Sequence, residues 1–208
     1  MIVTAIKAQI KNPDRVSIFV DGIYSFSLTL DQLLEQKLKK NDDISDQRIS
    51  ELKKLSEEGK LKARTLEWVL GRPHSTKEFR DYLYKKKADK ELIEAWIEEF
   101  TEKKYLNDEQ FARWFVENRQ RKNKSTRAVS AELRTKGVSP QTIQSIVIEL
   151  YGDNQEQDSL KLLVNKLRKK PRYHNEQKLK MYLVSKGFSY NDIKQVLSEA
   201  DDEPRLVP

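Results

Sequence analysis

Residue types that could carry catalysis or bind a metal are sparse in this sequence. The two histidines, His74 and His174, stand 100 residues apart, and each directly precedes a residue suited to cap a helix. We therefore expect both to be exposed loop residues rather than metal ligands or general bases. Acidic pairs such as Glu98-Glu99 are adjacent and so point to different faces of a helix. With no cysteine in the chain, thiolate nucleophiles and cysteine-based zinc sites are excluded. The sequence predicts no enzymatic activity, no cofactor and no metal.

The chemistry that remains is the binding of an anionic partner by cations. The 208 residues include 40 Lys or Arg against 33 Asp or Glu, a net charge of +7. These charges are sorted along the chain: residues 111–136 hold eight basic and two acidic residues, and residues 161–186 hold nine and one. Residues 89–109 hold the reverse, three basic and eight acidic. Such sorting favours a polyanion or an acidic protein groove, although a Lys-rich helix face can also be simply solvated.

Arginine is harder to explain by solvation alone, because its forked donors match phosphate and carboxylate groups. Arg127 and Arg134 are seven residues apart and share one helix face. Three loops, residues 72–74, 121–124 and 168–172, would form a basic stripe if their segments stack regularly. The candidate residues for contact with a partner, chosen by charge and face, are Arg113, Arg119, Arg121, Lys122, Lys124, Arg127, Arg134, Arg168, Lys169, Lys170 and Arg172.

The first part of the chain has the alternation of β-strands. Three short alternating segments within residues 1–28 predict an antiparallel meander, whose last two strands are joined by the two-residue turn Asp21-Gly22. Thr29, with Gln32 three residues later, predicts the start of a helix that covers the sheet. A longer helix then runs to Arg72-Pro73. The residues assigned to the apolar faces of the strands are Ile2, Ile6, Ala8 and Ile10, then Val16, Ile18 and Val20, then Tyr24, Phe26 and Leu28.

The rest of the chain repeats itself with a period of about 50 residues. Ser75, Ser125 and Asn175 align as helix N-caps, and a lysine follows each of them 11 residues later. Gly137 and Gly187 then stand where a left-handed C-cap is expected. Each block holds three helices too short to be stable alone, so they must bury their apolar stripes on one another.

The predicted fold is therefore mainly α: an elongated array of three tandem three-helix repeats, preceded by a small antiparallel β-meander with a helix. No apolar run is long enough to cross a membrane and no secretory signal is visible, so we expect a cytoplasmic monomer. The predicted domains are residues 1–45 for the meander and its helix, 46–104, 105–152 and 153–200 for the three repeats, and 201–208 for an acidic disordered tail.

Two longer motifs allow a comparison with known families. Residues 105–119 read Tyr-Leu-Asn-Asp-Glu-Gln-Phe-Ala-Arg-Trp-Phe-Val-Glu-Asn-Arg, and they are followed by Lys124-Ser-Thr-Arg127 and Glu132-Leu-Arg-Thr-Lys-Gly137. Residues 72–83 read Arg-Pro-His-Ser-Thr-Lys-Glu-Phe-Arg-Asp-Tyr-Leu. Together these motifs resemble the RecX family of recombinase regulators, a family known for tandem three-helix repeats. The similarity covers roughly residues 60–200.

The resemblance implies a modulator, usually an inhibitor, of the RecA recombinase that lodges in the groove of the RecA–DNA filament or at its end. Its implied partners are the RecA filament and single- or double-stranded DNA, contacted through phosphates. It also implies that Asp108, Phe111, Ala112, Phe115 and Leu133 are structural. Two alternatives remain, a stand-alone DNA-binding protein and a helical-repeat scaffold for a protein partner. The role of residues 1–45 is open.

Overall fold

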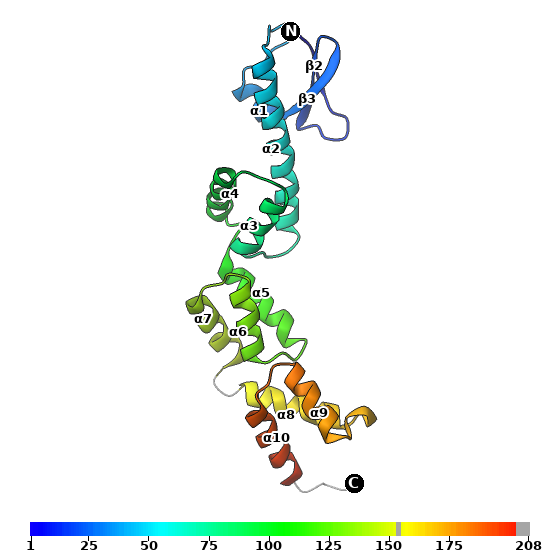
Figure 1. Ribbon diagram of the computed structural model, residues 1–208, viewed down its shortest axis with the longest axis vertical. Coiled ribbons are helices and arrows are strands. Elements are labelled where there is room, and N and C mark those ends of the chain that lie inside the picture. Colours follow the sequence, from blue (N-terminus) through cyan, green and yellow to red (C-terminus); the bar gives the residue numbers. More distant parts are fainter. Residues whose placement is uncertain (153–154, 203–208) are drawn as a thin grey trace. The chain divides into compact units, whose positions relative to one another are not determined.

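A computed structural model of the chain describes residues 1–152 and 155–202 (Figure 1). They form a mainly α-helical protein with one small antiparallel sheet, as predicted. The fold divides into two compact units, of which the first is Met1–Gly71 and the second begins at Arg72. Among the described residues, no helix is both long and apolar enough to cross a membrane. Residues 203–208 of the predicted acidic tail lie outside the described residues.

The first unit is a three-stranded sheet with two helices. Asp21 and Gly22 have φ angles of 48° and 82°, the positive values that the predicted hairpin turn requires at both central positions. Thr29 and Gln32 form the predicted capping box, in which each side chain accepts a hydrogen bond from the other residue's backbone N–H. In order along the chain the elements are β1 (Val3–Ala8), β2 (Arg15–Val20), β3 (Ile23–Thr29), α1 (Leu30–Glu35) and α2 (Asp46–Leu70), with sheet order β1-β2-β3.

The core of the first unit lies between one face of the sheet and the segments that follow it. Ile18, Phe26 and Leu28 are almost completely buried there, together with Ile49 and Leu52 from α2. The division at residue 71 places the long helix α2 with the sheet, because α2 supplies part of this core. The apolar face that the sequence predicts for β2 is therefore confirmed.

Two register shifts make the predicted faces of β1 and β3 partly wrong. Pairing between β1 and β2 shifts between Val3 and Ala5, so that Val3 is buried while Ile2 is 49% exposed. Ile10 is fully exposed because it lies beyond the end of β1. Pairing between β2 and β3 shifts after Ile18, where Ser25 is the extra residue. Strict alternation cannot reveal a bulge, because one extra residue moves its neighbours to the other face.

Among its described residues, the second unit has helices joined by short turns and contains no strand (Figure 1). The predicted caps are confirmed: the side chains of Ser75, Ser125 and Asn175 accept hydrogen bonds from the backbone three residues later. In order along the chain the helices are α3 (Thr76–Lys85), α4 (Lys90–Glu102), α5 (Asp108–Gln120), α6 (Thr126–Thr135), α7 (Pro140–Tyr151), α8 (Gln155–Arg168), the short 3₁₀ helix η1 (Pro171–Tyr173), α9 (Glu176–Ser185) and α10 (Tyr190–Asp202).

Each of the last two repeats has an apolar core of its own. Phe111, Val129 and Ile143 meet in the core that α5, α6 and α7 share, and Leu160, Leu179 and Ile193 meet in the core of α8, α9 and α10. Every one of these six side chains is at most 3% exposed. Since a short helix is marginal alone, this burial is what holds each three-helix repeat together.

Successive repeats join end to end through their middle helices. At the first joint, the N-terminus of α3 meets the C-terminus of α6: Ser75 Oγ donates to the carbonyl of Lys136 over 2.8 Å. Asp108, from the start of α5, accepts a hydrogen bond from the Thr76 N–H over 2.8 Å. Glu78 Oε1 lies 2.8 Å from Lys136 Nζ. The first joint thus satisfies helix-end groups on both sides with partners from the other repeat.

The second joint repeats this arrangement between α6 and α9. The Ser125 N–H donates to the carbonyl of Lys186 over 3.0 Å. Glu156, near the start of α8, accepts hydrogen bonds from both the N–H (2.8 Å) and the hydroxyl of Thr126. Gly187 comes so close to α6 that a Cβ on it would lie 2.4 Å from the Cβ of Ala128. Helix α6 is therefore held at both ends, by the first joint at its C-terminus and by the second at its N-terminus.

Candidate functional site

The structure separates the candidate cations into those with partners inside the chain and those without. Arg113, on α5, forms a two-pronged ion pair with Glu149 on α7. This hydrogen bonding raises the pKa of Arg113 and lowers the pKa of Glu149. Lys161 and Glu199 form the equivalent pair in the last repeat, with Nζ and Oε2 2.8 Å apart. The cation at this position ties the first helix of its repeat to the third.

Arg119 and Lys124 both bind Glu132 of α6. Arg119 Nε lies 2.5 Å from Glu132 Oε2, and Lys124 Nζ lies 3.5 Å from Glu132 Oε1. Burial would raise the pKa of Glu132, but the two cations outweigh it and hold that pKa below its usual value. The Arg119 guanidinium also stacks 4.2 Å from the centre of the Phe115 ring. These two cations therefore fix the α5–α6 corner of the second repeat.

Four other cations of the second repeat are exposed and form neither ion pairs nor side-chain hydrogen bonds within residues 1–152 and 155–199. They are Arg121 and Lys122 in the α5–α6 loop, and Arg127 and Arg134 on α6. Arg127 and Arg134 lie two turns apart and so share one face of the helix that both joints hold. We call these four side chains the open cations. A flexible, hydrated cation with no internal partner is available to phosphate or carboxylate.

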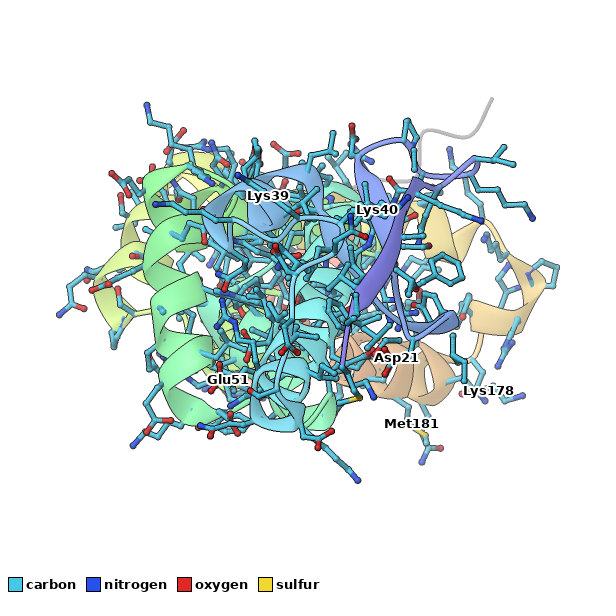
Figure 2. The ribbon with its side chains drawn as sticks, turned by 90° about the horizontal axis from the view of Figure 1, so that it is seen from above. Asp21, Lys39, Lys40, Glu51, Lys178 and Met181 are labelled. Atoms are coloured by element: carbon cyan, nitrogen blue, oxygen red, sulfur yellow. The ribbon has the colours of Figure 1, made fainter. Side chains whose placement is uncertain are left out.

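The third repeat contributes exposed cations at the end of α8. Lys169 and Lys170 are exposed in the turn before η1, and the Arg172 guanidinium lies 5.8 Å from the centre of the Tyr173 ring. Arg168 is half-buried and has an interaction within the chain. On the neighbouring α9, Lys178 and Met181 point away from the ribbon (Figure 2), and Met181 is 69% exposed.

The loop of residues 72–74 differs from the prediction. Arg72 is held within the second unit: NH1 lies 3.0 Å from Glu78 Oε2, and the guanidinium lies 5.0 Å from the centre of the Trp114 ring. His74 is only 3% exposed, and its Nδ1 lies 3.1 Å from the same Glu78 oxygen, so the prediction that it is exposed is wrong. The cause is the first joint, which packs around the start of α3. His174 is exposed, as predicted.

A cavity of about 360 Å³ lies beside the second joint. Its lining includes Lys124, Lys166 and Glu156 as well as the exposed side chain of Leu162. Tyr151 donates its hydroxyl to the Lys124 carbonyl over 3.0 Å, and burial raises the pKa of this phenol, so that it stays protonated. Among the described residues, no three His, Asp or Glu side chains gather in a way that could hold a metal.

Family models match three parts of the chain. The model for the N-terminal domain of the regulatory protein RecX matches residues 1–45. The models for the second and third three-helix domains of RecX match residues 107–145 and 155–197. Two of the matches thus fall on the repeats whose helices are α5 to α7 and α8 to α10.

Relatives match over nearly the whole length. Regulatory protein RecX of Bacillus subtilis (strain 168) is 33% identical over 206 residues, which cover 97% of this chain and 78% of the relative. Regulatory protein RecX of Bacillus pumilus (strain SAFR-032) is 32% identical over 204 residues, which cover 96% and 78%.

Solved structures have the same fold. A crystal structure of regulatory protein RecX superposes with a TM-score of 0.69 at 21% identity, covering 95% of this chain and 98% of the other. RecX from Lactobacillus salivarius superposes with a TM-score of 0.57 at 25% identity, covering 69% and 96%. The relatives that are more than 30% identical over nearly the whole chain show that it belongs to the RecX family of regulatory proteins.

Proposed function

We propose that this chain regulates the RecA recombinase, mostly as an inhibitor, by binding the RecA–DNA filament in its groove or at its end. The observation that carries the proposal is the match to regulatory RecX proteins over 97% of the chain. Bound in this way, the chain hinders filament extension, strand exchange and ATP hydrolysis. It acts as a cytoplasmic monomer and takes no part in covalent chemistry.

The open cations support this proposal. Arg127 and Arg134 stand on α6, whose two ends are fixed by Lys136 at the first joint and Ser125 at the second. A helix fixed at both ends loses little conformational freedom when a partner binds it, so less of the binding free energy is lost to ordering. Lys169 and Lys170 of the third repeat would extend the same contact. A nucleoprotein filament offers both phosphates and acidic protein side chains to these cations.

The α5 cations that pair within the chain have a different role in the proposal. Arg113 and Arg119 are committed to Glu149 and Glu132, and each of these bonds links two helices of the second repeat. We infer that these two arginines shape the repeat and that the open cations contact the partner. Replacing a paired arginine should therefore lower stability first and binding second.

The alternative is a stand-alone DNA-binding protein with contacts to phosphates only. The exposed and unpaired state of Arg121, Lys122, Arg127 and Arg134 favours it as much as it favours filament binding. This alternative predicts tight binding to DNA without recombinase, with an affinity that falls steeply with salt and does not depend on base sequence.

The experiment that tests the proposal is a titration of this chain into RecA on saturating single-stranded DNA, with the ATPase rate as the readout. With DNA at saturation, sequestration of the DNA can lower the rate only once this chain has covered a large share of the DNA. Inhibition well below one molecule per recombinase would support capture of the filament or of its growing end. Inhibition only near equimolar amounts, relieved by additional DNA, would support the stand-alone DNA-binding alternative. An unchanged rate at equimolar amounts would contradict the proposed function.

A further inference from the structure

The outer face of the N-terminal sheet carries an aromatic pair that the core does not use. The bulge at Ser25 pairs Phe19 with Tyr24, so that both side chains lie on the face opposite Ile18 and Phe26. The rings are 6.0 Å apart and nearly perpendicular, at 79°. Tyr24 is 49% exposed and Phe19 is half-buried. A regular pairing without the bulge would have turned Tyr24 towards the core.

The strand next to this pair places a small side chain and a cation beside the Phe19 ring. Ala5 is the β1 residue paired with Phe19, and its side chain is a single methyl group. Lys7, one pair further along, places its Nζ 5.1 Å from the centre of the Phe19 ring. Beyond Lys7, the Gln9 amide donates to the Ser17 hydroxyl over 3.0 Å. This face thus combines two rings, a lysine, an amide and a hydroxyl.

A second cation lies beneath the same face. Arg15 lies on the same face of β2 as Ser17 and Phe19, because every second residue of a strand shares a face. Arg15 is only 6% exposed. Its NH2 donates to the carbonyl and the hydroxyl of Ser27, over 2.9 and 3.1 Å. Its NH1 is buried and has no hydrogen-bond partner among the described residues. Such an unsatisfied donor is uncommon and calls for a ligand or a functional explanation.

The charges around Arg15 leave the face basic. Burial lowers the pKa of the Arg15 guanidinium, and the carboxylate of Glu57 opposes this shift. Glu57 Oε1 lies 2.7 Å from Lys60 Nζ. Lys60, and to a smaller extent Arg64, lower the pKa of the Glu57 carboxyl. The negative charge of Glu57 is therefore balanced by cations of its own helix. The cations of β1 and β2 on this face have no acidic strand residue beside them.

We propose that the outer face of the N-terminal sheet, centred on Phe19 and Tyr24, binds the unpaired bases of a single-stranded nucleic acid by stacking. Exposed aromatic rings on a small sheet stack bases of any sequence, and neighbouring cations hold the phosphates. Lys7 is placed to contact the backbone beside a base stacked on Phe19. The platform, defined as Lys7, Phe19 and Tyr24, works without a recombinase, so it stands or falls separately from the proposed function.

The test measures binding of the full chain to a labelled oligothymidine of about 20 nucleotides, long enough for one such platform. The double variant Phe19→Leu, Tyr24→Leu keeps apolar side chains in the strands but removes both rings. We expect its affinity to fall roughly fivefold to a hundredfold, with the salt dependence unchanged because every phosphate contact remains. Lys7→Gln should instead lower the salt slope by about 0.7, the contribution of one phosphate. Ile10→Ser, at a fully exposed apolar residue of the same unit, should bind as the unaltered chain does.

Three outcomes would overturn the proposal. The first is an unchanged affinity of the Phe19→Leu, Tyr24→Leu variant, with circular dichroism and melting equal to those of the unaltered chain. The second is an equal loss of affinity for a duplex of the same length, whose bases are not available for stacking. The third uses no variant: photocrosslinking of the unaltered chain to oligonucleotides containing 5-iodouracil, as DNA and as RNA, should label Phe19 or Tyr24. Crosslinks to other residues only would show that bases do not stack on this face.

Discussion

The two joints use the same positions with different chemistry. In the first joint, Glu78 and Lys136 form an ion pair across the contact, and a Cβ on Gly137 would lie 2.8 Å from the Cβ of Lys77. In the second joint, Ala128 occupies the position of Glu78, and the backbone of α6 comes close to Gly187. Where the two middle helices meet, the first joint thus has an ion pair and the second has close packing. The repeat preserves where the helices meet and lets the means of contact vary.

The largest expected effect is that of filling the closest contact. In Gly187→Ala, the new Cβ would lie 2.4 Å from Ala128 Cβ and 2.7 Å from Ser125 Oγ, and the residue would keep an unfavourable φ of 94°. We expect a loss of about 3 kcal/mol in the free energy of unfolding, from overpacking together with the left-handed backbone. Urea unfolding followed by circular dichroism would measure it.

Gly137→Ala is the matched change at the first joint. Its φ of 80° carries a similar backbone cost, but its nearest neighbour, the Cβ of Lys77, is at 2.8 Å rather than 2.4 Å, and the next atoms, Cδ and Cγ of the exposed Lys77 side chain, can rotate away. We expect a smaller loss, about 1–2 kcal/mol. If Gly137→Ala proved as costly as Gly187→Ala, the distinction between a charged and a close-packed joint would be wrong.

The acidic caps of the joints should differ in the same direction. Glu156 accepts two hydrogen bonds from Thr126, whereas Asp108 accepts one from Thr76. We expect Glu156→Ala to cost about 2 kcal/mol and Asp108→Ala about 1 kcal/mol, since each leaves helix N–H groups without their partner. Thermal unfolding of the two variants side by side would compare them. Equal losses would mean that the hydroxyl contact at Thr126 adds nothing.

Acid should weaken the first joint through Glu78. Burial would raise the pKa of Glu78, but hydrogen bonds from Lys136 and Arg72 outweigh it and keep the pKa below 4.5, the ordinary value. The stability that this carboxylate contributes is therefore complete above pH 4.5 and is lost as the pH falls through the lowered folded-state value. Glu78→Gln should reduce the fall in the urea midpoint between pH 5 and acid conditions of about pH 3. An identical fall in the variant would exclude Glu78 as a source of acid sensitivity.

The smallest effect on stability is expected at the C-terminal end of α3, which takes part in neither of the two joints. Lys87 takes the place of Gly137 and Gly187 after α3 and has a φ of 61°. Lys87→Gly should relieve the left-handed strain and stabilise the chain by at most about 1 kcal/mol. A loss of stability would show that the Lys87 side chain makes a contact that the glycines do not need. The melting temperature of the variant would decide.

Much of this architecture could be predicted from sequence because the repeat is marked by residues with strong local preferences. Ser75, Ser125 and Asn175 are residue types preferred at helix N-caps, and Gly137 and Gly187 have the positive φ angles typical of a glycine after a helix. Such signals act within a few residues, so a single sequence contains them. The capping box at Thr29 and the turn at Asp21-Gly22 were predictable for the same reason.

What the sequence could not show are contacts between distant segments. The family motif implies a structural role for Asp108, but the helix end that Asp108 caps belongs to Thr76 in the preceding repeat. Its counterpart Glu156 is 48 residues away rather than 50, so a fixed period does not align them. The burial of His74 and the pairing of Arg113 with Glu149 likewise depend on tertiary packing. Charge alone could not separate paired cations from the open cations.

The central claim is that the open cations of α6 act on the recombinase. The most direct test uses the double variant Arg127→Glu, Arg134→Glu. Its inhibition of the RecA ATPase is compared with that of a control double variant with the same change in charge. Lys39→Glu with Lys40→Glu provides that control, because both lysines are exposed in the loop after α1 (Figure 2). Removing one charged hydrogen bond to the partner costs about 1.5–3 kcal/mol, so the arginine variant should need at least about tenfold more protein for half inhibition. The control should inhibit as the unaltered chain does. Equal inhibition by the arginine variant and the control, with equal helix content and melting, would contradict the claim.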